Sequence, residues 1–226
     1  MYRVMLGVFT LLACKGVYAF NINLGSGEWY MLTVPGDTEQ SIEEAFSSSL
    51  SGDEYGETWS LFVFDSEIGQ YVQPPGTATL PSRGEAFWIV QETGSVVPVS
   101  IPDQLEYVQL TRSSICPTDV GCFEYPLPTG EGATWSMIGS PFIEGVYISE
   151  LIVKTDAGPC FDGCSLAQAS QAGLTGETFF AFNRGSEDYT ELSTNDILMP
   201  GDGHWFRTSI SSEYGSAQLI IANYCT

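Results

Sequence analysis

The chain has few basic residues. Its 226 residues include 7 Lys and Arg against 28 Asp and Glu, which gives a formal net charge of −21. A surface of this sign repels phosphate backbones, so the composition excludes a nucleic-acid partner. Long apolar runs are also missing. The run at residues 4–13 is too short to cross a bilayer, and no transmembrane span is expected.

The sequence lacks the motifs of common catalytic centres. It contains no G-x-S-x-G elbow, no H-E-x-x-H and no phosphate-binding Gly loop. A Ser-His-Asp triad needs a histidine base. The single histidine, His204, precedes Trp205, and in a similar segment earlier in the chain the residue before Trp88 is Phe87. No carboxylate pair recurs in an apolar context that would suit general acid catalysis. We therefore expect a protein without catalysis and keep a glycoside hydrolase as an alternative.

Residues 1–19 have the pattern of a secretory signal peptide. Arg3 supplies the positive charge, residues 4–13 the apolar stretch, and Val17-Tyr-Ala19 the cleavage site. The competing interpretation is a lipoprotein anchored at Cys14, in the sequence Leu-Leu-Ala-Cys. Cleavage after Ala19 removes Arg3 and Lys15 and takes the net charge to −23. The basic residues that remain are then Arg83, Arg112, Lys154, Arg184 and Arg207.

The cysteine spacing agrees with export, because disulfides persist in oxidising compartments. Close spacing favours two local bridges, Cys116–Cys122 and Cys160–Cys164. Cys225 is then a free or intermolecular thiol. Neither pair has the second ligand pair of a zinc site, and C-x3-C is not the C-x2-C of redox proteins. Both pairs are expected to be structural.

Two segments of the chain repeat the same landmarks. Residues 80–89 and 198–207 each combine a Gly-rich turn with a strand pattern that contains a tryptophan. Upstream landmarks keep their order and near-constant spacing, which predicts an internal duplication. The paired landmarks are Trp29 and Trp135, Pro35 and Pro141, Phe62 and Phe180, Phe64 and Phe182, Tyr71 and Tyr189, and Trp88 and Trp205.

These motifs resemble a tandem module of secreted and surface proteins of environmental bacteria. That module combines a W-x-[LM]-[IL]-x-x-P strand with a P-G-x-G-x-W turn and strand. The first motif occurs here as Trp29-Tyr-Met-Leu-Thr-Val-Pro35 and Trp135-Ser-Met-Ile-Gly-Ser-Pro141. The turn is Pro200-Gly-Asp-Gly203 in one copy and has become Pro81-Ser-Arg-Gly84 in the other. The module has no settled activity, so the resemblance implies a secreted, non-catalytic protein.

The expected fold is all-β with one or two short helices. The 24 Gly and 12 Pro favour short strands and turns. We expect two tandem repeats that form small β-sandwich or barrel-like units packed together. Residues 1–19 are the signal peptide, 20–128 the first repeat and 129–226 the second, with a disulfide-bearing insertion near 154–174. Strands are expected at 59–65, 105–112 and 217–222, among others, and capped helices at 42–50 and 165–172.

Residue roles follow from the repeats. Aromatic residues that recur are expected in the core, namely Trp29, Trp88, Trp135 and Trp205. Aromatic residues that do not recur are the candidates for stacking on a ligand: Tyr30, Tyr55, Trp59 and Tyr107. Calcium is the one cofactor left open, through the turn acids Asp65, Glu67, Glu187 and Asp188.

The sequence thus predicts a secreted, non-catalytic protein that binds a ligand or assembles on a surface. One alternative is a carbohydrate-binding module, with an extracellular glycan as partner. Another is a filament or sheath subunit that binds copies of itself by β-strand addition through the apolar segments Phe20–Leu24 and Ala217–Ala222.

Overall fold

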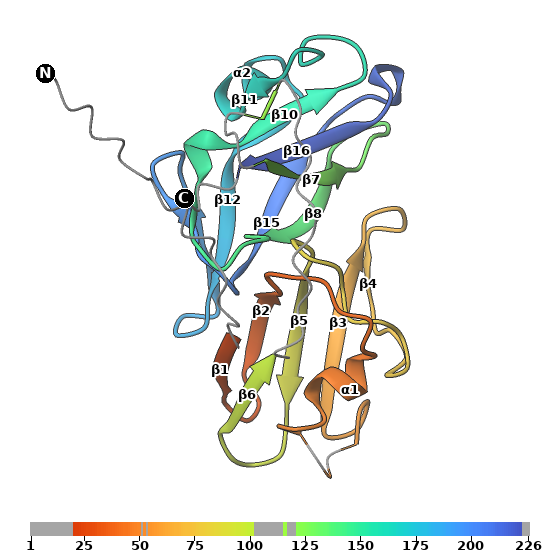
Figure 1. The fold of residues 1–226 in the computed structure, drawn as a ribbon, viewed down its shortest axis with the longest axis vertical. Helices are drawn as coiled ribbons and strands as arrows, with labels where there is room; N and C mark the ends of the chain where they lie inside the picture. Colours follow the sequence, from red (N-terminus) through yellow and green to blue (C-terminus); the bar gives the residue numbers. More distant parts are fainter. Residues whose placement is uncertain (1–19, 51, 53, 102–114, 117–120, 223–226) are drawn as a thin grey trace, which may run out of the picture.

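The structure is a computed structural model that describes residues 20–50, 52, 54–101, 115–116 and 121–222. It is all-β with two short α-helices, as expected. In the first half, shown red to yellow-green in Figure 1, one sheet has the order β2-β5-β3-β4 and a smaller one pairs β1 with β6. The elements are β1 (Phe20–Leu24), β2 (Trp29–Thr33), α1 (Ile42–Phe46), β3 (Trp59–Asp65), β4 (Gln70–Val72), β5 (Ala86–Gln91) and β6 (Val97–Ile101).

The second half contains two four-stranded sheets and a two-stranded sheet. Their orders are β11-β10-β16-β7, β13-β12-β15-β8 and β14-β9. The elements are β7 (Cys122–Leu127), β8 (Thr134–Gly139), β9 (Val146–Tyr147), η1 (Ile148–Glu150), β10 (Ile152–Thr155), β11 (Cys164–Ser165), α2 (Leu166–Gln171), β12 (Thr175–Asn183), β13 (Asp188–Leu192), β14 (Ile197–Leu198), β15 (Gly203–Thr208), η2 (Ser212–Tyr214) and β16 (Ala217–Ala222).

The sheets β2-β5-β3-β4 and β8-β15-β12-β13 have the same order and the same register. Trp88 lies opposite Met31 and Phe62 in the first sheet. Trp205 lies opposite Met137 and Phe180 in the second. The outer pairs also correspond, because Phe64 faces Tyr71 and Phe182 faces Tyr189. The landmarks of the sequence therefore occupy equivalent places in two equivalent sheets.

Alternation along these strands divides the apolar side chains between three clusters. Phe87 and Ile89 pack in the core of the first half, with α1 and β6. Phe179 and Phe206 pack in the core of the second half, between its two four-stranded sheets. The opposite faces contribute to one shared cluster around Met31, Ala86, Trp88, Met137 and Trp205. Both central sheets are thus covered on two sides, as the apolar pattern of 59–65 predicts.

The two halves meet through reciprocal backbone contacts. The Thr33 amide donates to the Gly201 carbonyl at 3.0 Å, and the Gly139 amide donates to the Gly84 carbonyl, also at 3.0 Å. Two isolated antiparallel bridges, Leu32 with Asp202 and Ile138 with Glu85, follow the same exchange. Each half therefore makes to the other the same contact that it receives, as in an interface between two subunits related by a two-fold axis.

The register also corrects the alignment of the two turns. Gly84 lies four residues before Trp88, as Gly201 lies four before Trp205, and both have positive φ, 78° and 82°. The counterpart of residues 200–203 is therefore 83–86, not 81–84. Glycine is required at this position because the left-handed conformation is unfavourable for other residues.

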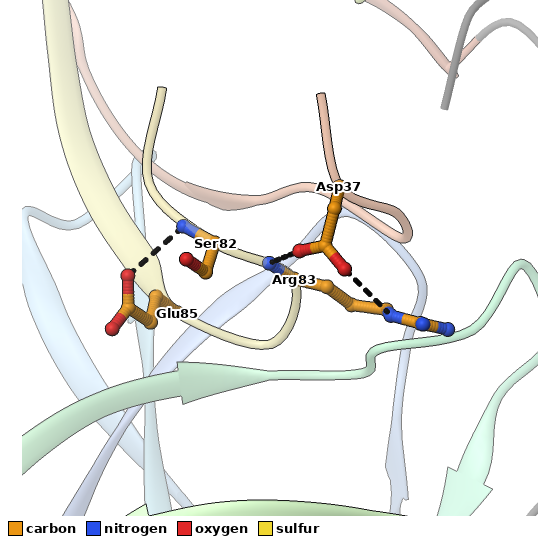
Figure 2. Close-up of polar contacts among 4 residues, drawn as sticks. All are labelled: Asp37, Ser82, Arg83 and Glu85. Atoms are coloured by element: carbon orange, nitrogen blue, oxygen red, sulfur yellow. Dashed lines mark hydrogen bonds and ion pairs between the residues drawn. The ribbon is translucent and has the colours of Figure 1, made fainter. Parts of the chain in front are cut away.

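Arg83 anchors the first of these turns. Its amide donates to Asp37 Oδ1 at 2.9 Å, and its Nε lies 3.8 Å from Asp37 Oδ2 (Figure 2). The side chain is 4% exposed, and its Cζ lies 5.2 Å from the ring centroid of Phe123 in the second half. Burial lowers the pKa of Arg83, and Asp37 opposes this. The pair therefore holds a guanidinium between the two halves.

Capping residues define both helices. Ser41 and Glu44 form a capping box at α1, and Ser165 and Gln168 form one at α2. Both helices turn apolar residues toward a core, for example Phe46 in α1 and Leu166 in α2. Residues 148–153, which periodicity left open between helix and strand, form a 3-10 turn followed by β10.

Two strands lie elsewhere than the sequence suggested. β7 belongs by position to residues 20–128, but it pairs with β16 in the second half. β16 was expected to offer a free edge, yet it lies between β10 and β7 and is paired on both sides. The prediction that Ala217–Ala222 adds to a neighbour's sheet is therefore wrong, because its backbone groups are already paired. The strand predicted at 105–112 lies outside the described residues.

Two disulfides close loops in the second half of the chain. They join Cys116 to Cys122 and Cys160 to Cys164. Such bonds favour an oxidising, extracellular environment. Cys225 and the segment with Cys14 and Ala19 lie outside the described residues. Among the residues that the structure describes, no helix has the length and hydropathy to span a bilayer.

Candidate ligand-binding cleft

A cleft of about 700 Å³ lies at the junction of the two halves. Most of its wall is aromatic, and the rings come from both central sheets. They are Trp29, Phe62, Tyr71, Trp88, Phe182 and Tyr189. Polar groups complete the wall through Gly27, Glu28, Arg184 and Glu187. A concave, mainly apolar wall with a few polar groups is the usual form of a small-molecule site.

The strands fix the orientation of the rings. Trp29, at the start of β2, packs on Phe62 with a centroid distance of 5.6 Å and on Trp88 at 6.2 Å. The indole of Trp88 donates to the Tyr71 hydroxyl at 3.3 Å, and its ring meets Phe182 edge-on at 4.8 Å. Trp88 is buried, but Trp29, Tyr71 and Tyr189 are 44%, 49% and 42% exposed. Three supported rings therefore remain open to a ligand.

Two tyrosines of the cleft interact across the junction. Burial raises the pKa of Tyr71, the hydrogen bond from Trp88 lowers it, and the nearby Tyr189 raises it further. The Tyr189 hydroxyl accepts a hydrogen bond from Trp205, as Tyr71 does from Trp88. Tyr71 therefore stays protonated at neutral pH and offers a neutral hydroxyl to a ligand.

Tyr30 supports the polar rim of the cleft from beneath. Its hydroxyl donates to Glu28 Oε2 at 2.8 Å and accepts from the Gly25 amide at 2.7 Å. The Cζ of Arg184 lies over its ring, 4.4 Å from the centroid. One buried side chain thus orients a carboxylate and a guanidinium on the same rim.

A second groove of about 760 Å³ lies at the equivalent place on the other side of the junction. Its wall includes Phe64 and Trp135, the counterparts of Phe182 and Trp29. By register, Ser136 is the counterpart of Tyr30 and Ser66 that of Arg184, and both line this groove. The two grooves therefore share one Phe–Trp pair but differ in their other rings and in their polar groups.

The predicted ligand residues are mostly misplaced. Tyr30 and Trp59 are 3% and 4% exposed, so neither can stack on a ligand. Trp59 packs against Phe46 in the first core. Tyr55 is half-buried, and its hydroxyl donates to the Leu61 and Pro74 carbonyls at 3.2 and 2.8 Å. Tyr107 lies outside the described residues.

The predicted core tryptophans differ in burial. Trp88 and Trp205 are buried, 6% and 9% exposed, in the shared cluster. Trp135 is half-buried against the same cluster. Placing Trp29 in the core is wrong, because it sits at the first position of an edge strand and one face of its ring borders the cleft. Repetition shows that a ring has an equivalent, and it does not show that the ring is covered.

The turn acids do not form a cluster. Asp65 Oδ1 accepts from the Glu67 and Ile68 amides, and Asp188 Oδ1 accepts from the Tyr189 amide. Glu187 has a positive φ of 53° in the turn between β12 and β13. Across the described ranges, no three His, Cys, Asp or Glu side chains converge on a point that could hold a metal ion.

The chain matches no family model, and no curated protein and no solved structure matches it either. The cleft is therefore interpreted from its own geometry.

Proposed function

We propose that the protein is a secreted, non-catalytic binding protein and that the aromatic cleft binds a saccharide. The observation that carries this is the set of three exposed rings, Trp29, Tyr71 and Tyr189, on a rigid β frame. A sugar packs its C–H face on a ring while its hydroxyls bond to neighbouring polar groups. Glu28, Glu187 and Arg184 are placed to make such bonds.

Rigidity supports the same proposal. Each exposed ring is held by a second aromatic group, as Trp29 is by Phe62 and Trp88. A wall that is already ordered loses little conformational entropy when it binds. The cleft is thus suited to a ligand that presents flat apolar patches and many hydroxyls.

Export is part of the proposal. The signal-like segment at 1–19 precedes a chain with two disulfides and a formal charge of −21 before cleavage. A soluble, acidic, disulfide-bonded β protein suits a glycan-containing extracellular environment.

An internal duplication accounts for the two grooves. We infer that one ancestral unit was copied and fused, which explains the identical strand order, the register and the reciprocal contacts. After fusion, the two related grooves were free to acquire different polar groups.

The test is a glycan array followed by titration calorimetry on the saccharides that bind. Replacing Trp29→Ala removes one exposed wall of the cleft, and we expect affinity to fall about tenfold or more, as for a buried aromatic contact in an interface.

Trp135→Ala is the matched control. Trp135 makes the equivalent ring contacts, 5.7 Å to Phe180 and 6.1 Å to Trp205, but lines the other groove. Both variants should lose similar thermal stability, and only Trp29→Ala should lose binding. Equal loss of affinity in both, or no saccharide bound by the unaltered protein, would reject the assignment.

A further inference from the structure

We propose that the saccharide carries a carboxylate and that Arg184 is the residue that selects it. This inference rests on the proposed function and specifies its ligand class as an acidic sugar. The two grooves place a Phe and a Trp at matched positions, and Arg184, which lines the cleft and stacks on the buried Tyr30, is replaced by Ser66 in the other groove.

Cations are rare in this chain, so their positions are informative. Seven Lys and Arg stand against 28 Asp and Glu in the sequence. An acid beside a cleft is expected by abundance alone, whereas an arginine there is not. Its counterpart in the other groove, Ser66, is uncharged. Because the net charge of −21 repels anions at long range, a preference for an acidic sugar has to come from this local positive charge.

The guanidinium of Arg184 is held in place by a contact that does not use its N–H groups. It lies over the Tyr30 ring, 4.4 Å from the centroid, and makes no hydrogen bond or ion pair to another described residue. Asp202 is close enough to feel its charge: burial raises the pKa of Asp202, and Arg184 lowers it. Stacking on a ring fixes the plane of a guanidinium and leaves its N–H edge free, which suits bidentate binding of a carboxylate.

The neighbouring acids fit the same ligand. Glu28 is fixed by the Tyr30 hydroxyl, and Glu187 lies on the turn that follows Arg184. Carboxylates accept hydrogen bonds only, so they bind the hydroxyls of a sugar and repel its carboxylate. An acidic sugar in the cleft is therefore oriented, with its carboxylate at Arg184 and its hydroxyls at the acids.

A pair of probes that differ only in charge tests this. Trigalacturonic acid and its methyl ester share one skeleton, and the ester lacks the negative charge. A saccharide ending in sialic acid provides a carboxylate from a second source. We expect the protein to bind at least one acidic probe about tenfold to a hundredfold more tightly than the ester, the range of a charge-assisted hydrogen-bonded pair.

The variants distinguish a direct contact at Arg184 from the long-range electrostatic field of the protein. Arg184→Gln should abolish the preference, because it weakens binding of the acid more than binding of the ester, while Arg184→Lys, which keeps the charge and loses the bidentate geometry, should retain part of it. Arg207→Gln removes the same charge from an exposed position of β15 that does not line the cleft, and should change nothing.

The outcomes distinguish the two proposals. If the ester and neutral saccharides bind as tightly as the acids, and Trp29→Ala weakens all of them, the cleft binds sugars and Arg184 does not select among them. If Arg207→Gln acts as Arg184→Gln does, the preference is a field effect and the assignment of Arg184 fails. If no probe and no arrayed glycan binds, both proposals fail.

Discussion

Individual residues decide what the cleft can do, and Tyr30 is the clearest example. Its absence from the second copy marked it as a functional candidate, and the structure connects it to the cleft through Glu28 and Arg184. Its own ring is covered, because it packs in the core of the first half and lies under Arg184. The sequence thus identified a residue that matters to the rim and assigned it the wrong contact.

A single buried histidine should make stability depend on pH. His204 is 2% exposed, and burial lowers its pKa to about 4, although a hydrogen bond to the Ile138 backbone opposes this. The unfolded imidazole titrates near ~6.5. Between these values the unfolded chain binds a proton that the folded chain does not. The free energy of unfolding should therefore fall as pH decreases from about 6.5 toward 4, by about 1.4 kcal/mol per unit.

The variant His204→Phe isolates this contribution. Phenylalanine occupies the equivalent position 87, and the buried His204 Nδ1 has no hydrogen-bond partner among the described residues. Urea unfolding at pH 7 and pH 5 should show a smaller difference in the variant than in the unaltered protein, because carboxylates contribute equally to both. If the two proteins lose the same free energy of unfolding between pH 7 and pH 5, the pKa of His204 is the same in the folded and unfolded chain.

Among the elements, strand β8 makes the tightest approach between the two halves. A methyl group on Gly139 would clash with the Thr33 side chain of the first half, and it would lie 2.5 Å from the Asp202 carbonyl oxygen of its own half, which belongs to backbone and cannot rotate away. Gly139→Ala should therefore destabilise the protein by about 1–3 kcal/mol, the usual cost of overpacking. Chemical denaturation measures the loss.

Gly130→Ala is the comparison, since its methyl would meet no atom within 4 Å. It should unfold at nearly the same denaturant concentration as the unaltered protein. A Gly139→Ala protein as stable as Gly130→Ala would mean that the two halves can separate at this point without loss.

The sequence predicted many of the individual strands and helices. Alternation over 59–65 located a strand with two apolar faces, and Ser41 with Glu44 located the start of α1. It misplaced β7 and β16, because pairing partners far apart in the chain leave no local pattern. It also did not identify the cleft, since Trp29 and Tyr189 line it together only after the halves have docked.

For the whole molecule, the shared aromatic cluster joins the stability of both halves. Phe64 meets Trp205 edge-on at 4.8 Å, and Phe182 meets Trp88 in the same way at 4.8 Å. Because each half completes the other's cluster, we expect one cooperative unfolding transition, with fluorescence and circular dichroism coinciding.

Phe64→Ala and Phe182→Ala should each cost about 2 kcal/mol, below the range for fully buried phenylalanine because both rings are half-buried. The two losses should be nearly equal. A variant in which one half unfolds while the other stays folded would show that the halves are independent.

The unequal grooves have a consequence for valency. Two grooves that each carried an arginine would let one molecule bridge neighbouring chains of an acidic polysaccharide and gel them. With Ser66 and Ser136 in place of a second arginine and tyrosine, the proposed function implies that one molecule would bind an acidic polysaccharide at a single site. Such a protein would coat the polysaccharide without cross-linking it, and introducing both side chains by Ser66→Arg and Ser136→Tyr would make it a cross-linker.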